Sequence, residues 1–440
     1  MKVMKFGGTS IGKPERMKQV AELIKNSSEP TIVVLSALNG TTNALEEISI
    51  GLASNERKRA SVNVAKLEAY YREFINELIN TESGMEKAEL IIAEHFEFLN
   101  IILKISYSLA LQKDILAQGE LLSTKIFSIY LDESGIEHEL LPALDFMQID
   151  NDGEPLIGNI RVKLSQILKE KKNKKLFITQ GYICRNHLGE VDNLKRGGSD
   201  YSASLIAAGI DASVCEIWTD IDGMQNNDPR VVKATIPIEQ LSFEEAAELA
   251  YFGAKILHPS SIWPARHYKI PVRLLNTMQP EANGTLVTMD AGSVGVKAIA
   301  AKDGIIAINI LSSRMLLAYG FLRKVFDIFE SYKTSIDMVT TSEVAVSVTI
   351  DSKEHLEDIR RDLDSFGKVE VEEDHTIVSI VGNEILQTPH LIKLIFESIH
   401  DIPVSMVSYG GSKHNISLLI KSEFKVATMK ALNKGLFGLE

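Results

Sequence analysis

The segment Lys5-Phe6-Gly7-Gly8-Thr9-Ser10 follows the apolar pair Val3-Met4 and precedes residues with helical spacing. Two adjacent glycines let backbone N–H groups approach an anion closely, and the neighbouring lysine adds positive charge. Nucleotide phosphates need this chemistry, so the segment predicts a polyphosphate site after a first strand. Taken alone, the two glycines fit a plain strand-to-helix turn equally well.

A competing interpretation of the same region is a P-loop. Gly7, Gly12 and Lys13 have the P-loop spacing, which requires Ser or Thr at the next position. That residue is Pro14, which has no hydroxyl for Mg²⁺ and no N–H for a phosphate. We therefore reject the P-loop, and Pro14 instead predicts the first position of a helix.

Length and composition limit the classes of protein. A chain of 440 residues exceeds what one hydrophobic core usually serves, so two or three domains are expected. The formal net charge of −12 argues against a nucleic-acid partner. No apolar run approaches the ~20 residues of a membrane span, so no membrane partner and a cytoplasmic location are expected. Cys184 and Cys215 fit buried thiols, and the histidines lack metal-ligand spacing, so any metal ligands stay unknown.

Two further polar segments follow predicted elements of the amino-terminal half. The apolar run Thr31 to Leu35 predicts a buried parallel strand, and Ser36 and Thr42 come after it. Both are candidates for substrate hydrogen bonds, although Thr42 or its neighbour also fits a helix cap. In the predicted helix 114–131, a glycine precedes Glu120, which indicates a close approach of ligand or backbone.

A third glycine turn contains Arg196, two glycines, Ser199 and Asp200, directly before the predicted helix Tyr201 to Gly209. An arginine and two glycines at a helix amino terminus are typical of an anion site. Ser199 or Asp200 also fits the N-cap of that helix.

Other polar residues lie after the predicted strand 214–218. Thr219 and Asp220 follow it directly, and Arg230 comes shortly afterwards. Hydroxyl and carboxylate groups at a strand end can hold a ribose or a hydrated Mg²⁺, although this stretch also contains plain turn signals. The predicted helix Ser242 to Ile256 carries Lys255 near its end.

The recurrence of strand, glycine turn and helix predicts an α/β domain at 1–290, with a mostly parallel sheet between helices. Residues 300–440 contain an internal repeat, in which Ile328-Phe329-Glu330-Ser331 recurs as Ile395-Phe396-Glu397-Ser398. Each copy reads as a ferredoxin-like βαββαβ unit, at 300–373 and 374–440. The last strand of the second copy is expected to be short, missing or borrowed.

Together these residues resemble the monofunctional aspartate kinases, which have an amino-acid kinase fold followed by two ACT domains (α+β). The resemblance covers nearly the whole chain. It rests on seven segments in order: Lys5 to Ser10; Ser36 with Thr42-Asn43; Gln118-Gly119-Glu120; Arg196 to Asp200; Thr219-Asp220 with Asp228-Pro229-Arg230; Phe243 to Pro259; and Gly320-Phe321-Leu322 with Ser342-Glu343. The chain departs from the usual family pattern at Lys195, normally glycine, and at Gln225, where many members carry an aromatic residue.

The resemblance implies transfer of the γ-phosphoryl group of ATP to the side-chain carboxylate of L-aspartate, the first step toward lysine, threonine and methionine. It assigns the catalytic roles to Lys5 and Asp200, with Gly7 and Gly8 contributing N–H groups. It assigns aspartate binding to Ser36, Thr42, Glu120 and Arg196. It assigns nucleotide binding to Thr219, Asp220, Arg230 and Lys255, with Mg²⁺ held largely by phosphate oxygens and water.

The ACT pair implies inhibition by an amino acid, with lysine as first choice and threonine as second. Resemblance to the lysine-sensitive branch places the effector site at Met315, Gly320, Phe321, Ser335, Asp337, Ser342 and Glu343. Asp337 and Glu343 are expected to meet the two ammonium groups of lysine, unless they are turn and strand-edge residues without a ligand. A homodimer or dimer of dimers through the ACT domains is expected, because an incomplete sheet edge suits a partner.

Two alternatives remain open on these observations. One is a kinase of another amino-acid carboxylate, such as glutamate. The other is a catalytically silent ACT-based amino-acid sensor, against which the joint presence of Lys5, Glu120, Arg196 and Asp200 argues. The chain ends after the repeats, so no fused dehydrogenase is expected.

Overall fold

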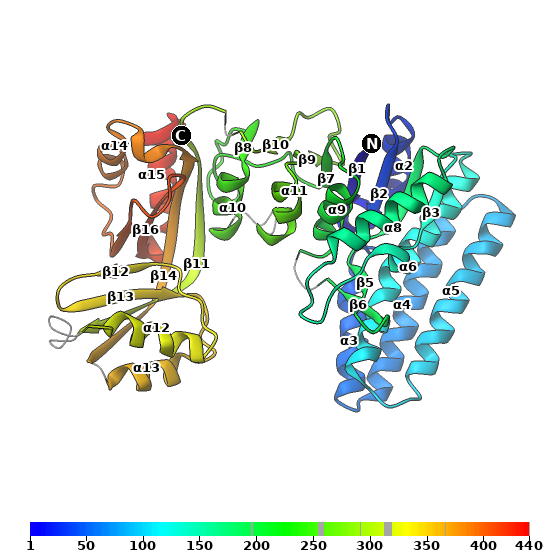
Figure 1. Ribbon diagram of the computed structural model, residues 1–440, viewed down its shortest axis with the longest axis horizontal. Coiled ribbons are helices and arrows are strands. Elements are labelled where there is room, and N and C mark those ends of the chain that lie inside the picture. Colours follow the sequence, from blue (N-terminus) through cyan, green and yellow to red (C-terminus); the bar gives the residue numbers. More distant parts are fainter. Residues whose placement is uncertain (195–196, 254–258, 291, 312–318, 366, 440) are drawn as a thin grey trace. The chain divides into compact units, whose positions relative to one another are not determined.

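The computed structural model describes residues 1–194, 197–253, 259–290, 292–311, 319–365 and 367–439 (Figure 1). It divides into two compact units. Unit 1 comprises Met1–Met224, Glu239–Phe243 and Leu257–Asp290, and unit 2 comprises Gln225–Ile238, Glu244–Ile256 and Ala291–Glu440. The expected domain at 1–290 is therefore not one compact unit, because two of its segments belong to unit 2.

Unit 1 is built on an eight-stranded sheet with the order β3-β4-β2-β1-β7-β9-β10-β8. Its strands are β1 (Lys2–Phe6), β2 (Thr31–Leu35), β3 (Glu139–Leu141), β4 (Leu176–Gln180), β7 (Cys215–Thr219), β8 (Gln240–Ser242), β9 (Val272–Asn276) and β10 (Thr285–Thr288). All neighbouring strands are parallel except β9 and β10. A small hairpin, β5 (Ile183–Arg185) and β6 (Val191–Asn193), lies outside this sheet. The mostly parallel sheet expected from the sequence is confirmed.

The sheet places the predicted turns at one edge. In the parallel register, Phe6 at the end of β1 pairs with Leu35 of β2 and with Trp218 of β7. The turns that begin at Gly7 and Ser36 and the turn after Thr219 therefore leave the sheet at the same edge. Parallel α/β sheets bind ligands at this carboxyl edge.

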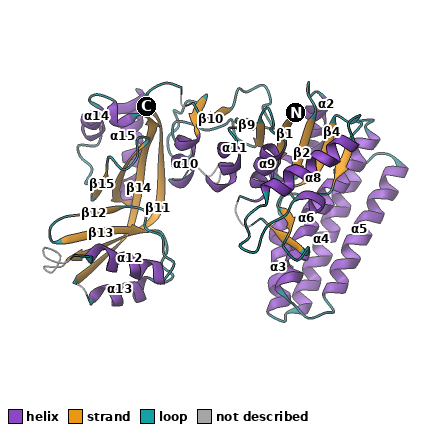
Figure 2. Cartoon of the chain, viewed as in Figure 1, coloured by secondary structure: helices purple, strands orange, loops and turns teal. Residues whose placement is uncertain are grey.

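Helices supply most of the remainder of unit 1 (Figure 2). They are α1 (Gly8–Ile11), α2 (Pro14–Lys25), α3 (Thr41–Ala53), α4 (Arg57–Leu78), α5 (Glu82–Ile102), α6 (Leu109–Glu133), α7 (Ala143–Phe146), α8 (Ile157–Glu170), α9 (Gly198–Gly209), η1 (Pro259–Ile262) and α11 (Trp263–His267). Helix α10 (Phe243–Tyr251) begins at the boundary with unit 2. Pro14 opens α2, as predicted, whereas α10 ends earlier than the expected Ile256.

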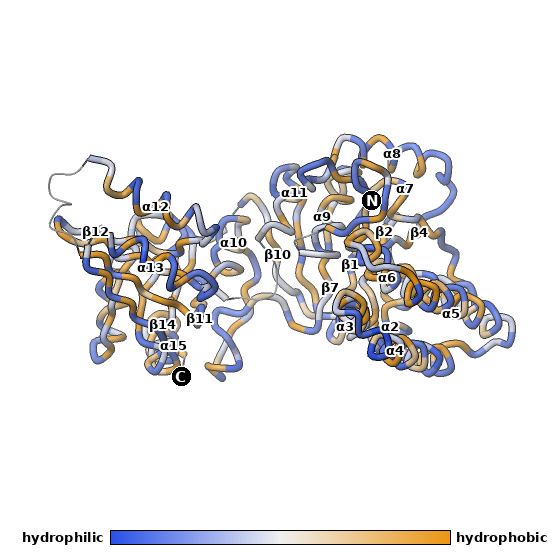
Figure 3. Tube along the Cα trace, turned by 90° about the horizontal axis from the view of Figure 1, so that it is seen from below, coloured by the Kyte–Doolittle hydropathy of each residue, from blue (hydrophilic) through white to orange (hydrophobic). Residues whose placement is uncertain are grey.

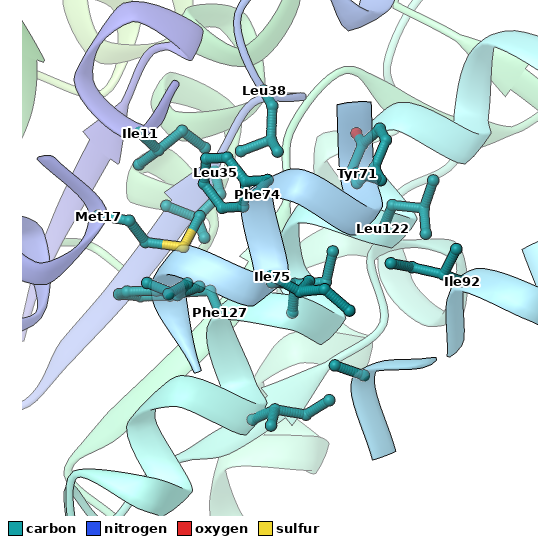
Figure 4. Close-up of a cluster of buried hydrophobic side chains, with 14 of the residues drawn as sticks. Ile11, Met17, Leu35, Leu38, Tyr71, Phe74, Ile75, Ile92, Leu122 and Phe127 are labelled. Atoms are coloured by element: carbon teal, nitrogen blue, oxygen red, sulfur yellow. The ribbon is translucent and has the colours of Figure 1, made fainter. Parts of the chain in front are cut away.

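The long helices α4, α5 and α6 pack through apolar faces. Hydrophobic and hydrophilic residues alternate along α4 and α5, as Figure 3 shows, because each of these two helices has one face toward its neighbours and one toward solvent. Helix α6 is buried on all sides over residues 115–120. Their buried cluster includes Tyr71, Phe74, Ile92 and Phe127 and continues to the sheet at Leu35 (Figure 4). In the described part of the chain, no helix combines the length and apolarity that a membrane span needs.

Unit 2 contains one six-stranded sheet with the order β12-β13-β11-β14-β16-β15. The strands are β11 (Gly295–Leu311), β12 (Val339–Thr341), β13 (Ala345–Ile350), β14 (Lys368–Asn383), β15 (Met406–Ser408) and β16 (Asn415–Lys421). The helical segments are α12 (Phe321–Ser331), α13 (Leu356–Asp364), η3 (Ile385–Gln387), α14 (Leu391–Ser398), η4 (Ser422–Phe424) and α15 (Lys425–Phe437). Each repeat has its own buried apolar cluster, centred on α12 and α13 or on α14 and α15.

The two repeats share the long strands β11 and β14. The carboxyl-terminal half of β11 pairs with β13 and with the start of β14, whereas residues 295–302 pair with the end of β14. Residues 295–302 thus supply the strand that the second repeat lacks in sequence. The expected boundaries at 300 and at 373/374 are wrong, because they fall inside β11 and β14. The strand is borrowed within the chain, so its absence gives no argument for a partner.

Candidate active and effector sites

Lys5 is held by an ion pair at the predicted anion turn. Its Nζ lies 2.6 Å from Oδ1 of Asp200, and both side chains are largely buried. A Cβ on Gly7 would come within 3.3 Å of that Nζ, and one on Gly8 within 2.9 Å of the Ala37 carbonyl oxygen. The predicted contact between Lys5 and Asp200 is confirmed, and the glycines permit close approach here. Lys13, by contrast, is exposed at the start of α2, in agreement with rejection of the P-loop.

The second turn joins the first to a buried carboxylate. The Ala37 N–H donates to Oε1 of Glu120 on α6 at 3.2 Å. Gly119 makes this packing possible, because a Cβ there would lie 2.7 Å from the Ala37 Cβ. Oε2 of Glu120 is buried and has no hydrogen-bond partner among the described residues. The predicted close approach at Gly119 is confirmed, and Glu120 presents an unused oxygen beside Ala37.

Burial controls the protonation of this carboxylate. It raises the pKa of Glu120 from 4.5 to about 8, although the Ala37 N–H acts in the opposite direction. Besides burial, the negative charge of Glu120 contributes to raising the pKa of Tyr71 and of Tyr182. Burial raises the pKa of both phenols, that of Tyr182 to about 12, so both stay neutral at physiological pH. In the described residues no cation pairs with Glu120, so a bound ammonium group would stabilise its ionised form.

Ser36 and Thr42 lie on either side of the same turn, and neither of them caps α3. The Ser36 carbonyl accepts the hydroxyl of Ser123 on α6 at 2.8 Å, which ties the turn to that helix. Gly40, with φ of +81°, is the N-cap of α3, so the proposed cap at Thr42 or Asn43 is wrong. Thr42 instead lies half-buried in the first turn of α3. A contact with substrate stays a prediction for both hydroxyls.

The third turn leads into α9, whose first turn carries Asp200. Gly197, with φ of +70°, is the N-cap of α9. The prediction that Ser199 or Asp200 caps this helix is therefore wrong. Gly197 lies so close to Ser261 that a Cβ would approach its Cβ at 2.5 Å. Arg196, predicted to bind a substrate carboxylate, lies outside the described residues.

The residues predicted for the nucleotide divide between the units. Thr219 ends β7, and its hydroxyl donates to Asp220 at 3.2 Å. Arg230 belongs to unit 2, is exposed, and pairs with Asp228 at 2.7 Å. Lys255 lies outside the described residues. No three His, Cys, Asp or Glu side chains within the described ranges gather closely enough to hold a metal ion.

Asp337 is the buried carboxylate among the predicted effector residues. Only 1% of its side chain is exposed, and its Oδ1 lies 2.8 Å from Nζ of Lys302 on β11. The Tyr251 hydroxyl at the end of α10 donates to the same oxygen. Burial and this hydrogen bond raise the pKa of Tyr251 to about 12. Burial alone would lower the pKa of Lys302, but its hydrogen bonds to Asp337 and Asp351 outweigh burial and raise it.

The other predicted effector residues are more exposed or lie elsewhere. Gly320 caps α12 with φ of +83°, Phe321 is buried after it, and Ser335 is exposed. The Ser342 hydroxyl accepts the Ala345 N–H at 3.1 Å within the hairpin between β12 and β13. Met315 lies outside the described residues.

Glu343 does not lie beside Asp337 in one chain. It is exposed in the hairpin turn, whereas Asp337 lies before the other end of β12, where its N–H donates to the Thr349 carbonyl. The four residues of extended chain from Asp337 to Thr341 alone span about 13 Å. An extended lysine and the two acidic side chains together can bridge a span of this size, so the contact of one lysine with both carboxylates stays a prediction.

Sequence reasoning missed the partners of both buried carboxylates. Lys302 and Tyr251 contact Asp337 from 35 and 86 positions away, respectively, so no local pattern marks them. Tyr182, whose phenol lies within electrostatic range of Glu120, adopts φ of +64°, which is rare for a residue with a side chain. A strained residue beside Glu120 fits a functional site, and only the backbone shows it.

Comparisons with known proteins define the class first. The model of the Amino acid kinase family matches residues 1–276, and an ACT domain model matches residues 378–436. The sequence is 32% identical to the lysine-sensitive aspartokinase 3 of Escherichia coli (strain K12), over 99% of both chains. It is 34% identical to the chloroplastic aspartokinase 3 of Arabidopsis thaliana, over 99% of this chain and 81% of that protein.

Solved structures agree. E. coli aspartokinase III in complex with aspartate and ADP matches with a TM-score of 0.83 and 31% identity, covering 99% of this chain and 100% of that chain. The same enzyme in complex with lysine and aspartate matches with a TM-score of 0.82 and 32% identity, covering 99% of each chain. The chain belongs to the aspartokinase family, and its activity is ATP-dependent phosphorylation of aspartate under amino-acid feedback.

Proposed function

We propose that L-aspartate binds at the carboxyl edge of the unit 1 sheet, with its α-ammonium group on Glu120 and its side chain directed toward Lys5. The observation that carries this proposal is the buried Oε2 of Glu120 beside Ala37, which has no hydrogen-bond partner among the residues that the structure describes. Because the Gly8 backbone packs against the Ala37 carbonyl, the glycine turn and the glutamate belong to one site. The related E. coli enzyme has been solved with aspartate and ADP.

The reaction at this site needs no general base. The aspartate side chain is already ionised at pH 7, so its oxygen attacks the γ-phosphorus directly. A new oxygen–phosphorus bond forms, the bond to the β,γ-bridging oxygen breaks, and ADP leaves with the released electron pair. The products are 4-phospho-L-aspartate and ADP, and no proton is transferred. Catalysis then depends on positioning and charge neutralisation, which Lys5 and the backbone N–H groups of the turn provide.

The remaining assignments extend the same proposal. Asp200 orients the Lys5 ammonium through their ion pair. Arg196 pairs with a carboxylate of the substrate, because a planar guanidinium suits that shape, and Ser36 and Thr42 add hydrogen bonds. Thr219, Asp220, Arg230 and Lys255 serve the nucleotide. These roles rest on the sequence resemblance.

Mg²⁺ would supply charge neutralisation on the transferring phosphoryl group. The Thr219 to Asp222 turn offers one hydroxyl and two carboxylates, a donor set that fits a hydrated Mg²⁺ through its waters. We assign most of its direct ligands to phosphate oxygens.

For regulation we propose lysine as the inhibitor, with threonine as second choice, and Asp337 as the residue that accepts a lysine ammonium group. Support comes from the buried Oδ2 of Asp337, to which no described residue donates a hydrogen bond. The E. coli relative is described as lysine-sensitive and has been solved with lysine and aspartate.

We also propose assembly as a homodimer or dimer of dimers through the ACT repeats. The strands β12 and β15 end the six-stranded sheet on either side. Edge strands carry unpaired backbone groups that suit pairing with a second copy. Light scattering during size-exclusion chromatography tests this proposal, and a monomer at micromolar concentration would contradict it.

The catalytic assignment is tested by Lys5→Ala, with Lys13→Ala as the matched control on the neighbouring helix. Removing a charge that stabilises the transition state is expected to lower kcat about 10²-fold or more. Lys13→Ala is expected to retain activity. Full activity in Lys5→Ala together with loss in Lys13→Ala would instead support the P-loop.

Trapping of the acyl phosphate with hydroxylamine tests the substrate. We expect the hydroxamate with L-aspartate and little with L-glutamate. Product with glutamate alone would favour the alternative kinase, and no product with either would favour the silent sensor.

A further inference from the structure

One oxygen of Asp337 already binds two groups of the chain itself, the Lys302 ammonium and the Tyr251 hydroxyl. Lys302 bridges Asp337 at 2.8 Å and Asp351 at 2.9 Å, and the Tyr251 hydroxyl donates to the same Asp337 oxygen as Lys302. The Lys302 ammonium also lies 4.4 Å from the centre of the Tyr251 ring. Tyr251 therefore contacts the cluster twice, by its hydroxyl and by its ring.

The cluster retains capacity for one more cation. Two carboxylates face one ammonium group, which leaves a net charge of about one negative unit. Oδ2 of Asp337 is buried, and nothing in the described part of the chain donates a hydrogen bond to it. A buried carboxylate oxygen without a donor is costly, and an ammonium ligand would relieve that cost.

Another side chain of the helix that carries Tyr251 contacts the second ACT repeat of unit 2. On α10, Glu248 accepts hydrogen bonds from Ser412 at 2.8 Å and from Asn415 at 3.1 Å, both in the second ACT repeat. Tyr251, three residues later on the same helix, contacts the first repeat at Asp337. One helix thus contacts both repeats through side chains one turn apart. In sequence, α10 precedes Lys255, one of the residues proposed for the nucleotide.

We infer that Tyr251 and the effector compete for Asp337, so that an effector ammonium on Asp337 weakens the hold of Lys302 and Tyr251 and releases the end of α10. This inference rests on the proposed role of Asp337 in lysine binding and extends it to the signal that leaves the site.

The direction of the effect follows from charge. A second ammonium group on the same buried carboxylate repels Lys302, which has Asp351 as an alternative partner. As Lys302 moves toward Asp351, its contact with the Tyr251 ring weakens, and the hydroxyl shares its acceptor with a cation. Linkage is reciprocal, so if the Tyr251–Asp337 contact weakens effector binding by some factor, removing the Tyr251 hydroxyl must strengthen effector binding by the same factor.

The experiment uses the full chain and L-lysine as the probe. Isothermal calorimetry measures the lysine Kd, and the kinase assay measures the residual activity at saturating lysine relative to the same variant without lysine. Tyr251→Phe is expected to bind lysine about threefold to tenfold more tightly and to be less completely inhibited. Lys302→Met, which leaves two carboxylates without a cation, is expected to bind lysine at least tenfold more tightly.

A matched control is Tyr332→Phe, because the Tyr332 hydroxyl donates to Asp362 at 2.8 Å elsewhere in the first repeat. This variant is expected to match the wild type in both measurements. Unchanged or weaker lysine binding in both Tyr251→Phe and Lys302→Met, with wild-type inhibition, would overturn the competition while leaving lysine as the effector. Absence of lysine binding to the wild type would remove the effector proposal and the competition together. A melting curve of each variant identifies loss of folding. Because Tyr251→Phe and Lys302→Met change different groups of the same cluster, each variant tests the competition independently of the other.

Discussion

Glu120 in unit 1 and Asp337 in unit 2 are both buried carboxylates with one oxygen that lacks a donor in the described residues. They differ in what contacts the other oxygen. Among the described residues, Glu120 receives the Ala37 N–H alone, whereas Asp337 receives Lys302 and Tyr251. The described part of the chain thus offers Glu120 no counter-charge, whereas the negative charge of Asp337 is already partly neutralised by Lys302.

This difference matches two kinds of task. A carboxylate without a cation favours its protonated form, so ligand binding must remove a proton and gains a full ion pair in return. A carboxylate already paired with a lysine gains less binding free energy from a second cation. Binding of that second cation, however, weakens the contacts that the carboxylate made before. The first arrangement suits tight selection of a substrate ammonium group, and the second suits a signal.

The largest effect that tests this contrast is expected from Glu120→Gln. The amide keeps the shape but cannot form an ion pair with the substrate ammonium. Truncating one member of a buried charge pair costs about 2–5 kcal/mol, so kcat/KM for aspartate should fall between about 30-fold and about 4,000-fold. Steady-state kinetics measure this, with KM for ATP as the internal control. A Gln variant with wild-type kcat/KM would remove Glu120 from substrate binding.

The pH dependence provides the next test. With a pKa of about 8, Glu120 is mostly protonated in the free enzyme at pH 6 to 7, and aspartate binding requires the ionised form. Apparent affinity for aspartate should therefore rise about tenfold per pH unit from pH 6 toward 8 and level off above that. The neighbouring phenols of Tyr71 and Tyr182 titrate at higher pH and do not contribute in this range.

Glu120→Gln is also the control for this profile. Its aspartate affinity should be low but flat across the same pH range, as followed by KM or by calorimetry with aspartate. The same slope in the Gln variant would show that another group titrates, and that ionisation of Glu120 does not cause the pH dependence.

The sequence could predict the catalytic turns because their chemistry is local. Adjacent glycines mark a close approach of backbone, and Gly119, a glycine inside a helix, marks the tight packing of α6 against Ala37. The partners of Asp337 could not be predicted in this way. Lys302 lies in Lys302-Asp303-Gly304, which has the composition of a turn, yet β11 continues past it through an irregularity in the ladder where Gly304 adopts φ of +76°.

The same feature explains why the expected domain boundaries are misplaced. A strand of 17 residues serves two repeats, and it continues on both sides of Lys302-Asp303-Gly304, where one repeat ends and the other begins. Local patterns identify each strand as such, but pairing between residues 295–302 and the end of β14 depends on contacts distant in sequence. Sheet partners are therefore the part of this fold that a single sequence leaves open.

The smallest effects are expected at the effector carboxylates, and they sharpen the comparison by separating Asp337 from Glu343. Asp337→Asn removes a charged acceptor from a buried site, so the lysine concentration for half-maximal inhibition should rise about tenfold. Glu343→Ala removes an exposed carboxylate at the hairpin and should change that concentration no more than about threefold, because exposed pairs contribute little. A rise in Glu343→Ala equal to that in Asp337→Asn would mean that both carboxylates contact the ligand.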